Sequence, residues 1–273
     1  MYQYRLAKQT EIRYPSFSGR ESCLILDPCD TGRFWSVGGH DVPLTAEMIH
    51  LGWFHHLYLQ SGKTRMRMAE HFLPLLGHGV TGFRMTMKTS GLPYDGRGQL
   101  FWESVKPNLR LHGFLKPYAP PFHTLASTTR WLRGTVPRRI TYMRTNEAHL
   151  TVRIKMDYGL GKQYEKDFVL PRDWDHVITA RHRGRNYLYQ AARAASRLGW
   201  PHIHHIAWEQ ELDIRELLEE EARHRVLDFL GYAALHVPDG CTLTGMFISN
   251  CAGHSDDHDL FSKWRNELAR AAL

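Results

Sequence analysis

The stretch Ala222-Arg223-His224-Arg225-Val226-Leu227-Asp228 lies inside the longest helical pattern of the chain, over residues 214–235. Apolar residues recur along this pattern at the spacing of an amphipathic helix. His224 and Asp228 are four residues apart, so such a helix presents both side chains on one face. Because imidazole and carboxylate groups both bind zinc, this face is a candidate metal site.

A second candidate segment, Glu70-His71, lies far away along the chain. If His71 joins His224 and Asp228, these three ligands leave the fourth position of a tetrahedral zinc open for water. Glu70 is then available to take a proton from that water, which completes the groups that amide hydrolysis requires. His254 follows Gly253 on a turn after an apolar strand, a position from which it can reach into a cleft.

The rest of the chain reads as strands followed by helices, twice over. The expected strands are residues 2–14, 21–27, 53–60, 80–88, 140–144, 150–157, 163–170 and 242–249. The expected helices are residues 66–76, 99–105, 187–198, 214–235 and 257–273. Pro74 falls inside the first of these helices, where it should produce a kink or limit the helix to about two turns.

This order of elements predicts an α+β fold with two similar layered α/β-sandwich domains and mostly antiparallel sheets. The segment Lys116-Pro117-Tyr118-Ala119-Pro120-Pro121 is the best linker, because its prolines disfavour both helix and central strand. We therefore expect an N-terminal domain over residues 1–125, with Glu70-His71 on a helix. A C-terminal domain over residues 126–273 is expected to carry the His224/Asp228 helix and a loop with His254.

Composition limits the classes of function. The chain has 273 residues, a net charge of +7 and four cysteines without a CxxC pair. No apolar run is long enough to span a bilayer, and the first residues lack the apolar core of a signal peptide. We expect a soluble, cytoplasmic protein with free thiols and no stable membrane insertion. The positive charge fits an anionic partner, which can be a phosphate-bearing small molecule, nucleic acid or an acidic membrane face. The partner expected here is a small-molecule substrate, either anionic or a sugar, and the sequence does not indicate the oligomeric state.

Three motifs together resemble those of the UDP-3-O-acyl-N-acetylglucosamine deacetylases, zinc amidases of lipid A synthesis in Gram-negative bacteria. That family carries a Glu-His helix, an "HKxxDxxGD" helix and a "GH" loop, in this order. The chain matches them with Glu70-His71, with His224-Arg225-Val226-Leu227-Asp228-Phe229-Leu230-Gly231-Tyr232 and with Gly253-His254. Weaker similarities are Asp30-Thr31-Gly32, Leu92-Pro93-Tyr94-Asp95-Gly96 and Ala180-Arg181-His182-Arg183-Gly184-Arg185.

The resemblance implies two similar α+β domains with the metal between them. It implies that His71, His224 and Asp228 bind Zn²⁺, although Fe²⁺ is also compatible with such a ligand set. By the same resemblance, Glu70 is the general base and His254 is the general acid, or a cation that stabilises the oxyanion and the leaving amine.

Two departures from the family pattern lie in the helix motif that begins at His224, and one of them affects the expected general acid. The lysine after the first helix histidine is Arg225, which keeps the charge and is assigned here to substrate binding. The final aspartate of "GD", which orients the catalytic histidine, is Tyr232. Without that carboxylate His254 should be a weaker acid–base partner, unless Asp256 or Asp257 substitutes.

Other departures concern the substrate. By the resemblance, His182 stands where the family has an oxyanion-binding threonine, and Asp95 stands in its "PxxDGS" loop. Arg183 and Arg185 replace phenylalanines of an acyl channel, and a cation is costly to desolvate beside a lipid chain. Arginine instead suits phosphate or a polar sugar. We therefore expect a divergent deacetylase that acts on a small N-acetylated aminosugar, nucleotide-linked sugars included.

Several alternatives remain open. The chain can instead be an authentic UDP-3-O-acyl-N-acetylglucosamine deacetylase, or a non-catalytic module that retains the fold and the metal. The 181–185 arginines can contact nucleic acid, although no nucleic-acid motif supports this and no such partner is expected. A second metal site is conceivable at Cys251, His254, Asp256 and His258.

Overall fold

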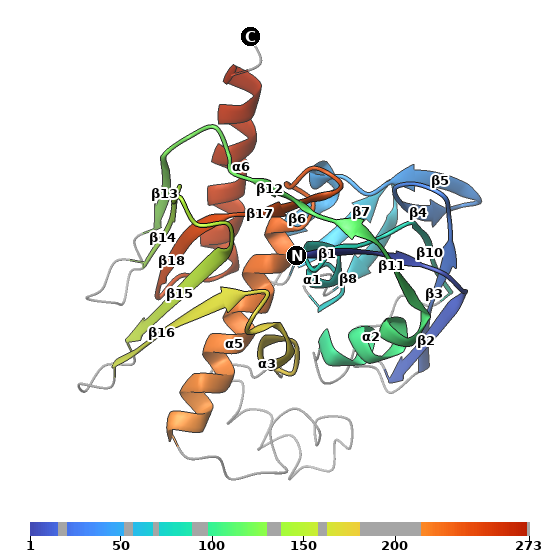
Figure 1. Ribbon diagram of the computed structural model, residues 1–273, viewed down its shortest axis with the longest axis horizontal. Coiled ribbons are helices and arrows are strands. Elements are labelled where there is room, and N and C mark those ends of the chain that lie inside the picture. Colours follow the sequence, from blue (N-terminus) through green and yellow to red (C-terminus); the bar gives the residue numbers. More distant parts are fainter. Residues whose placement is uncertain are drawn as a thin grey trace.

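Two five-stranded sheets form the framework of the protein (Figure 1). The structure is a computed structural model that describes residues 1–15, 21–51, 57–67, 71–88, 98–129, 138–157, 163–180 and 214–271. The first sheet has the order β2-β3-β10-β4-β5. Its strands are β2 (Thr10–Pro15), β3 (Glu21–Pro28), β4 (Arg33–Val37), β5 (His40–Pro43) and β10 (Phe83–Met87).

The second sheet is built from the later half of the chain and has the order β13-β14-β18-β15-β16. Its strands are β13 (Thr124–Thr129), β14 (Arg138–Met143), β15 (Leu150–Asp157), β16 (Gln163–Leu170) and β18 (Gly245–Asn250). In each sheet the last strand along the chain inserts between the second and the third. It pairs antiparallel with the second and parallel with the third. The two sheets therefore share one topology.

The other described strands form smaller sheets. An antiparallel meander consists of β6 (Ile49–Leu51), β7 (Leu57–Ser61) and β8 (Thr64–Arg67). Strand β1 (Tyr2–Leu6) pairs with β11 (Leu109–Phe114) and with β9 (Val80–Thr81). Strand β12 (Lys116–Tyr118) pairs in parallel with β17 (Cys241–Leu243), so it joins a segment before the second sheet to one near its end.

In the order of elements along the chain, helices occupy equivalent positions relative to the two sheets. The helices are α1 (Pro74–Gly77), α2 (Gly98–Val105), α3 (Trp174–Ile178), α5 (Ile214–Ala233) and α6 (His254–Ala271). Short 3₁₀ turns cover Ala46–Met48 and Lys106–Asn108. The segments with α1 and α5 each precede the last strand of a sheet, whereas α2 and α6 each follow it. None of the described helices combines the length and apolarity that a membrane span requires.

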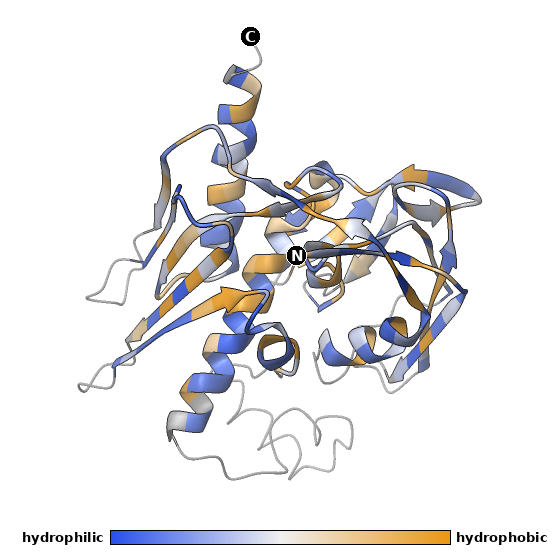
Figure 2. Ribbon diagram, in the orientation of Figure 1, coloured by the Kyte–Doolittle hydropathy of each residue, from blue (hydrophilic) through white to orange (hydrophobic). Residues whose placement is uncertain are grey.

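Helix α5 packs against α1, α3 and α6 and against strands β15 and β16. It runs through the middle of the molecule in Figure 1, and Figure 2 shows it changing from hydrophilic to hydrophobic along its length. Residues 224–233 are all buried, so this part of the helix faces protein on every side. The expectation of an amphipathic helix is therefore wrong for its second half, where polar side chains must find internal partners.

Most of the expected elements are confirmed. Strands 150–157 and 163–170 and the helix at 99–105 are found within one residue of their expected bounds. The α+β class with mostly antiparallel sheets is also confirmed. Buried apolar residues from both sheets form one cluster. The expected helix 187–198 and residues 53–56 of an expected strand lie outside the described residues.

Other expectations about secondary structure are wrong as well. Met66 and Arg67 belong to β8, where they pair with Leu59 and Tyr58, so the helix over 66–76 shrinks to α1. Pro74 begins that helix instead of kinking it, because the first helical position needs no backbone N–H. The proline-rich linker contains the short strand β12, whose only described partner is β17.

A turn between α1 and β9 brings the first half of the chain onto the second. His78 lies between two indoles: its ring stacks on Trp174 at 4.0 Å and meets Trp102 edge-on at 4.9 Å. Gly79 next to it has φ of 94°, and a Cβ there would lie 2.6 Å from the Tyr2 carbonyl oxygen. Only glycine allows β1 to approach this turn so closely.

Candidate functional site

His224 and Asp228 lie on the buried part of α5, as the helical spacing predicts. The Nε2 atom of His224 is 3.2 Å from Oδ1 of Asp228. Their exposed fractions are 8% and 6%, so the pair is almost completely removed from solvent. An imidazole and a carboxylate buried this deeply must be compensated by hydrogen bonds, charges or a metal ion.

His71 approaches this pair from the other half of the chain. It is completely buried, and the centroid of its ring is 5.5 Å from that of His224, with an angle of 41° between the planes. The turn that carries it is fixed by Phe72, which contacts Phe83 and Phe101 edge-on at 5.9 Å. Packing of α1 against α5 then brings the two histidines together.

His254 is the third group that converges on α5. Its Nε2 atom lies 3.5 Å from Oδ2 of Asp228, on the opposite carboxylate oxygen from His224. His254 is the first residue of α6, so the expectation of a loop there and of a helix that starts only at 257 is wrong. The reason is a local cap: the Gly253 N–H donates to the Asp256 carboxylate at 2.7 Å, and the Asp256 N–H donates to the Gly253 carbonyl at 2.9 Å.

Arg225 points away from the surface and is committed to an ion pair inside the protein. Its two terminal nitrogens donate to the two carboxylate oxygens of Asp257 at 2.6 and 2.5 Å. Burial alone would lower the pKa of Arg225, but the Asp257 carboxylate overrides this effect and raises the pKa above its usual value. The charge of Arg225, which was expected to bind substrate, joins α5 to α6 through this ion pair.

Tyr232 occupies the position at which the resembling family has a carboxylate. Its ring is 6.1 Å from that of His254 and stacks on Phe261. Asp256 caps the start of α6 and Asp257 binds Arg225, so each of these carboxylates already has a structural role. A carboxylate within reach of the His254 ring is that of Asp228.

The remaining residues predicted for the site lie outside the described residues. They are Glu70, Asp95, His182, Arg183 and Arg185. The structure therefore brings together His71, His224, Asp228 and His254 and leaves the other predicted positions undescribed. Of the alternative metal ligands, Asp256 is committed to the cap of α6.

The donor set of the site fits a divalent metal in kind. Two imidazoles that share a zinc at about 2.0–2.1 Å hold their ring centres about 5 Å apart, which is close to the 5.5 Å between His71 and His224. However, no group of three or more histidine, cysteine, aspartate or glutamate side chains in the described ranges is already arranged to hold an ion. The side chains would have to turn toward a common centre on binding.

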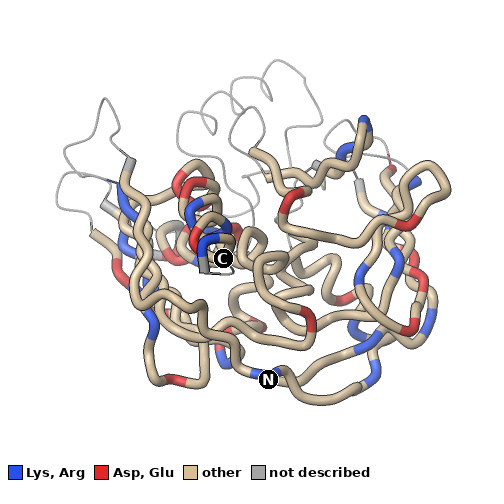
Figure 3. Tube along the Cα trace, turned by 90° about the horizontal axis from the view of Figure 1, so that it is seen from above, with Lys and Arg blue, Asp and Glu red and all other residues tan. Residues whose placement is uncertain are grey.

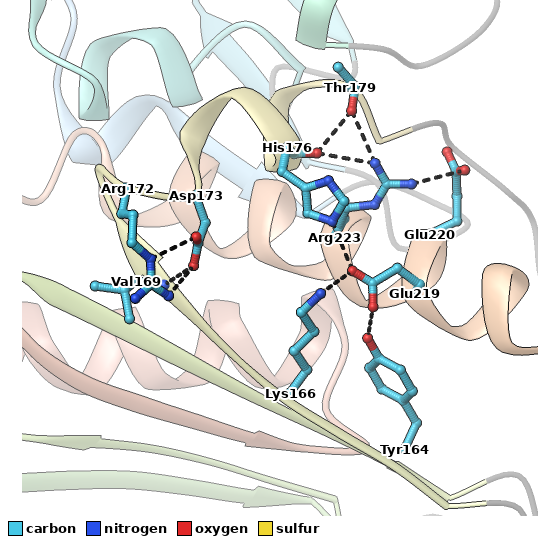
Figure 4. A network of polar contacts seen from close by, with 10 residues as sticks. All are labelled: Tyr164, Lys166, Val169, Arg172, Asp173, His176, Thr179, Glu219, Glu220 and Arg223. Atoms are coloured by element: carbon cyan, nitrogen blue, oxygen red, sulfur yellow. Dashed lines mark hydrogen bonds and ion pairs between the residues drawn. The ribbon is translucent and has the colours of Figure 1, made fainter.

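A polar network beside the site was not predicted (Figure 4). The Glu219 carboxylate on α5 accepts hydrogen bonds from Tyr164, from Lys166 at 2.5 Å and from His176 at 2.8 Å. Burial alone would raise the pKa of Glu219, but these three donors lower it to about 2. Tyr164 and Lys166 alternate along β16, and this spacing could have indicated a shared partner.

Arg223 extends the network to the residue before His224. Its guanidinium donates to the His176 carbonyl at 3.2 Å and to Thr179 Oγ1 at 3.0 Å, at the end of α3. Cations are favourable at the C-terminal end of a helix, where carbonyl groups are otherwise unsatisfied. The network thus fixes the rotation of α5, and with it the direction of the His224 side chain.

Neither known protein families nor curated protein sequences show a match to this chain. The resemblance seen in the motifs consequently depends on the residues and their geometry. Its strongest points are the approach of His71 to His224, the contacts of Asp228 with two histidines, and the shared topology of the two sheets.

Proposed function

We propose that this chain is a metal-dependent amide hydrolase, a divergent relative of the UDP-3-O-acyl-N-acetylglucosamine deacetylases. The proposed substrate is a small N-acetylated aminosugar, and a nucleotide-linked sugar is the first to test. The observation that carries the proposal is the convergence of His71 with His224 and Asp228, which come from opposite halves of the chain. Burial of two imidazoles and a carboxylate is costly in free energy unless they bind one another or a metal ion.

In the proposed site, His71, His224 and Asp228 hold zinc or iron. When bound, such an ion polarises the acetyl carbonyl and lowers the pKa of a water molecule toward about 7. Glu70, next to His71 in sequence, takes the proton from the attacking water. His254, whose Nε2 atom lies 3.5 Å from Oδ2 of Asp228, gives a proton to the leaving nitrogen.

The reaction is a simple hydrolysis. The amide C–N bond breaks, the acetyl carbon takes the hydroxyl of water, and the sugar nitrogen takes the proton. The products are acetate and a free amine. No oxidant, reductant or second substrate is required.

The shared topology of the two sheets supports the proposed layout of two similar α+β domains, with a boundary near residue 125. His71 lies in the segment before the last strand of the first sheet, and His224 lies in the equivalent segment of the second. Two related halves that face one another thereby each supply a histidine to the site. This placement is what an active site between two domains requires.

The choice of a polar substrate depends on Arg183 and Arg185, where the resembling family has apolar side chains. With Arg225 used internally, these two arginines are the proposed contacts for a phosphate or a sugar hydroxyl. His182 is proposed to face the oxyanion, and Asp95 to bind the sugar. We place a long acyl chain outside the preferred substrates, because desolvating either arginine beside it is unfavourable.

The test is a deacetylation assay on purified protein loaded with zinc or iron. UDP-N-acetylglucosamine and its 3-O-acylated form are compared, and release of the free amine is measured. We expect activity on the unacylated sugar, and a Glu70→Gln variant should retain metal while losing about 10²–10⁴-fold in rate. A strong preference for the acylated sugar would identify an authentic lipid A enzyme. Metal binding without hydrolysis of any N-acetyl sugar would instead leave a non-catalytic module.

A further inference from the structure

The ribbon formed by β1 and β11 carries an unusual group of exposed apolar side chains. In the described parts of the chain, four large hydrophobic residues are exposed, and three of them lie in this ribbon. They are Tyr2, Leu111 and Phe114, with exposed fractions of 50%, 60% and 73%. Scattered exposed hydrophobic residues are normal, but a group of this kind marks an interaction surface.

Strand pairing places these side chains on one face. Tyr2 is opposite Phe114 and Tyr4 is opposite Leu111 in the antiparallel register. The Tyr2 and Phe114 rings are 5.3 Å apart. Farther along the same face of β1, Leu6 is completely buried. The face therefore runs from the core outward and ends as a protruding apolar surface.

The segments around this surface are basic and contain no acidic residue. Residues 1–8 and 106–118 include Arg5, Lys8, Lys106, Arg110 and Lys116 but no aspartate or glutamate. The N-terminus, at the start of β1, lies at the margin of the molecule in Figure 3. Nearby in the adjoining two-stranded sheet, Asp239 precedes β17, and its carboxylate binds Arg33 at 3.1 Å. In this register Arg5 is opposite Arg110, so these two cations lie on the other face of the ribbon from Tyr4 and Leu111. The exposed lysines Lys8, Lys106 and Lys116 flank the ribbon.

We propose that the β1–β11 ribbon docks the protein on an anionic lipid surface. Tyr2, Leu111 and Phe114 enter the headgroup region, where aromatic rings with a polar edge are well accommodated. The exposed lysines that flank the ribbon are attracted to the negative headgroups. A second copy of the chain is a poorer occupant, because pairing two identical ribbons brings like charges together. This surface is independent of the proposed hydrolase activity and of the residues around His224.

Co-sedimentation with vesicles tests the proposal. The full chain is mixed at low salt with vesicles of phosphatidylcholine, or of phosphatidylcholine with an equal part of phosphatidylglycerol. We expect binding to the anionic vesicles only, and weaker binding as salt is added. Leu111→Ser with Phe114→Ser should weaken binding by about tenfold or more, and Lys116→Glu, next to the apolar end of the ribbon, by a similar factor. All three positions are exposed, so circular dichroism should show an unchanged fold.

Two matched controls come from elsewhere on the surface. Met143 is 40% exposed and Lys63 lies on an exposed turn, so Met143→Ser and Lys63→Glu make the same chemical changes away from the ribbon. These variants should bind the vesicles as well as the original protein does. Absence of binding to anionic vesicles at low salt overturns the proposal. So does a dimer in solution that Phe114→Ser dissociates, or binding to polyglutamate with none to the vesicles.

Discussion

The imidazole rings of His71 and His224 lie with their centroids 5.5 Å apart, although one precedes the last strand of the first sheet and the other precedes that of the second. This approach depends on α1 packing against α5. Asp228 contacts both His224 and His254, so α5 and the start of α6 meet at one buried carboxylate, and His224 in turn meets His71 from the first half of the chain. The predictions below test what this arrangement binds and what holds it in place.

Loss of His71 should abolish tight metal binding while leaving the fold intact. His71→Gln keeps a polar side chain of similar size, and removing a direct ligand should weaken zinc binding by about a hundredfold or more. The zinc content after dialysis and the affinity from calorimetry give the measurement. His40 is exposed on β5, so His40→Ala is the control and should bind zinc normally. Equal zinc binding by both variants would exclude His71 as a ligand.

Breaking the Arg225–Asp257 ion pair should destabilise the protein strongly. Asp257→Leu leaves a buried guanidinium uncompensated, and this typically costs about 3–5 kcal/mol in the free energy of unfolding. The double variant Arg225→Met/Asp257→Leu should recover most of that loss, because an apolar pair needs no desolvation. Urea denaturation measures both. Glu267→Ala, which breaks an exposed pair with Arg270, should cost less than about 1 kcal/mol.

His78 should make the protein sensitive to moderate acid. Burial between Trp102 and Trp174, the main cause, lowers the pKa of His78 to about 3 from an ordinary 6.5. Below pH 6.5 the unfolded chain therefore binds a proton that the folded protein excludes, and stability declines as the pH falls from 6.5 toward 3.

The variant His78→Phe keeps an aromatic ring and removes this titration. Between pH 6.5 and 3 the free energy of unfolding should decrease less for this variant than for the original protein. The difference between the two decreases should reach up to about 5 kcal/mol. Unfolding curves at several pH values between 6.5 and 3 give the comparison. Parallel pH profiles for the two proteins would show that His78 is not excluded from protonation in the folded state.

Glu219 should contribute stability at neutral pH that disappears in stronger acid. Its pKa is lowered from 4.5 to about 2 in the folded protein. Between these two pH values the carboxylate of the folded protein stays charged, whereas that of the unfolded chain is already protonated. Stability is present above pH 4.5 and is lost as the pH falls toward 2. Glu219→Gln should unfold more easily at pH 7, by about 1–3 kcal/mol, and show a flatter acid limb. Glu103→Gln, on the exposed side of α2, should change neither.

The local sequence pattern was sufficient to predict elements in which apolar and polar residues alternate, or in which apolar residues repeat at helical spacing. Strands β15 and β16 and helix α5 were predicted within two residues of their bounds. The segment 66–76 was not, because a short apolar run suits either a strand or a helix. Its pairing with Tyr58 and Leu59 across the β7–β8 hairpin decides between the two.

The sequence by itself determined the class of fold and placed His224 and Asp228 on one helical face, because both follow from the periodicity of the backbone. It also singled out His71 and His254, through their resemblance to the motifs of a zinc deacetylase family. Only the tertiary structure decided that Arg225 turns inward to Asp257, that α6 begins at His254, and that His71 meets His224. Each of these depends on packing between segments distant along the chain, which no local pattern contains.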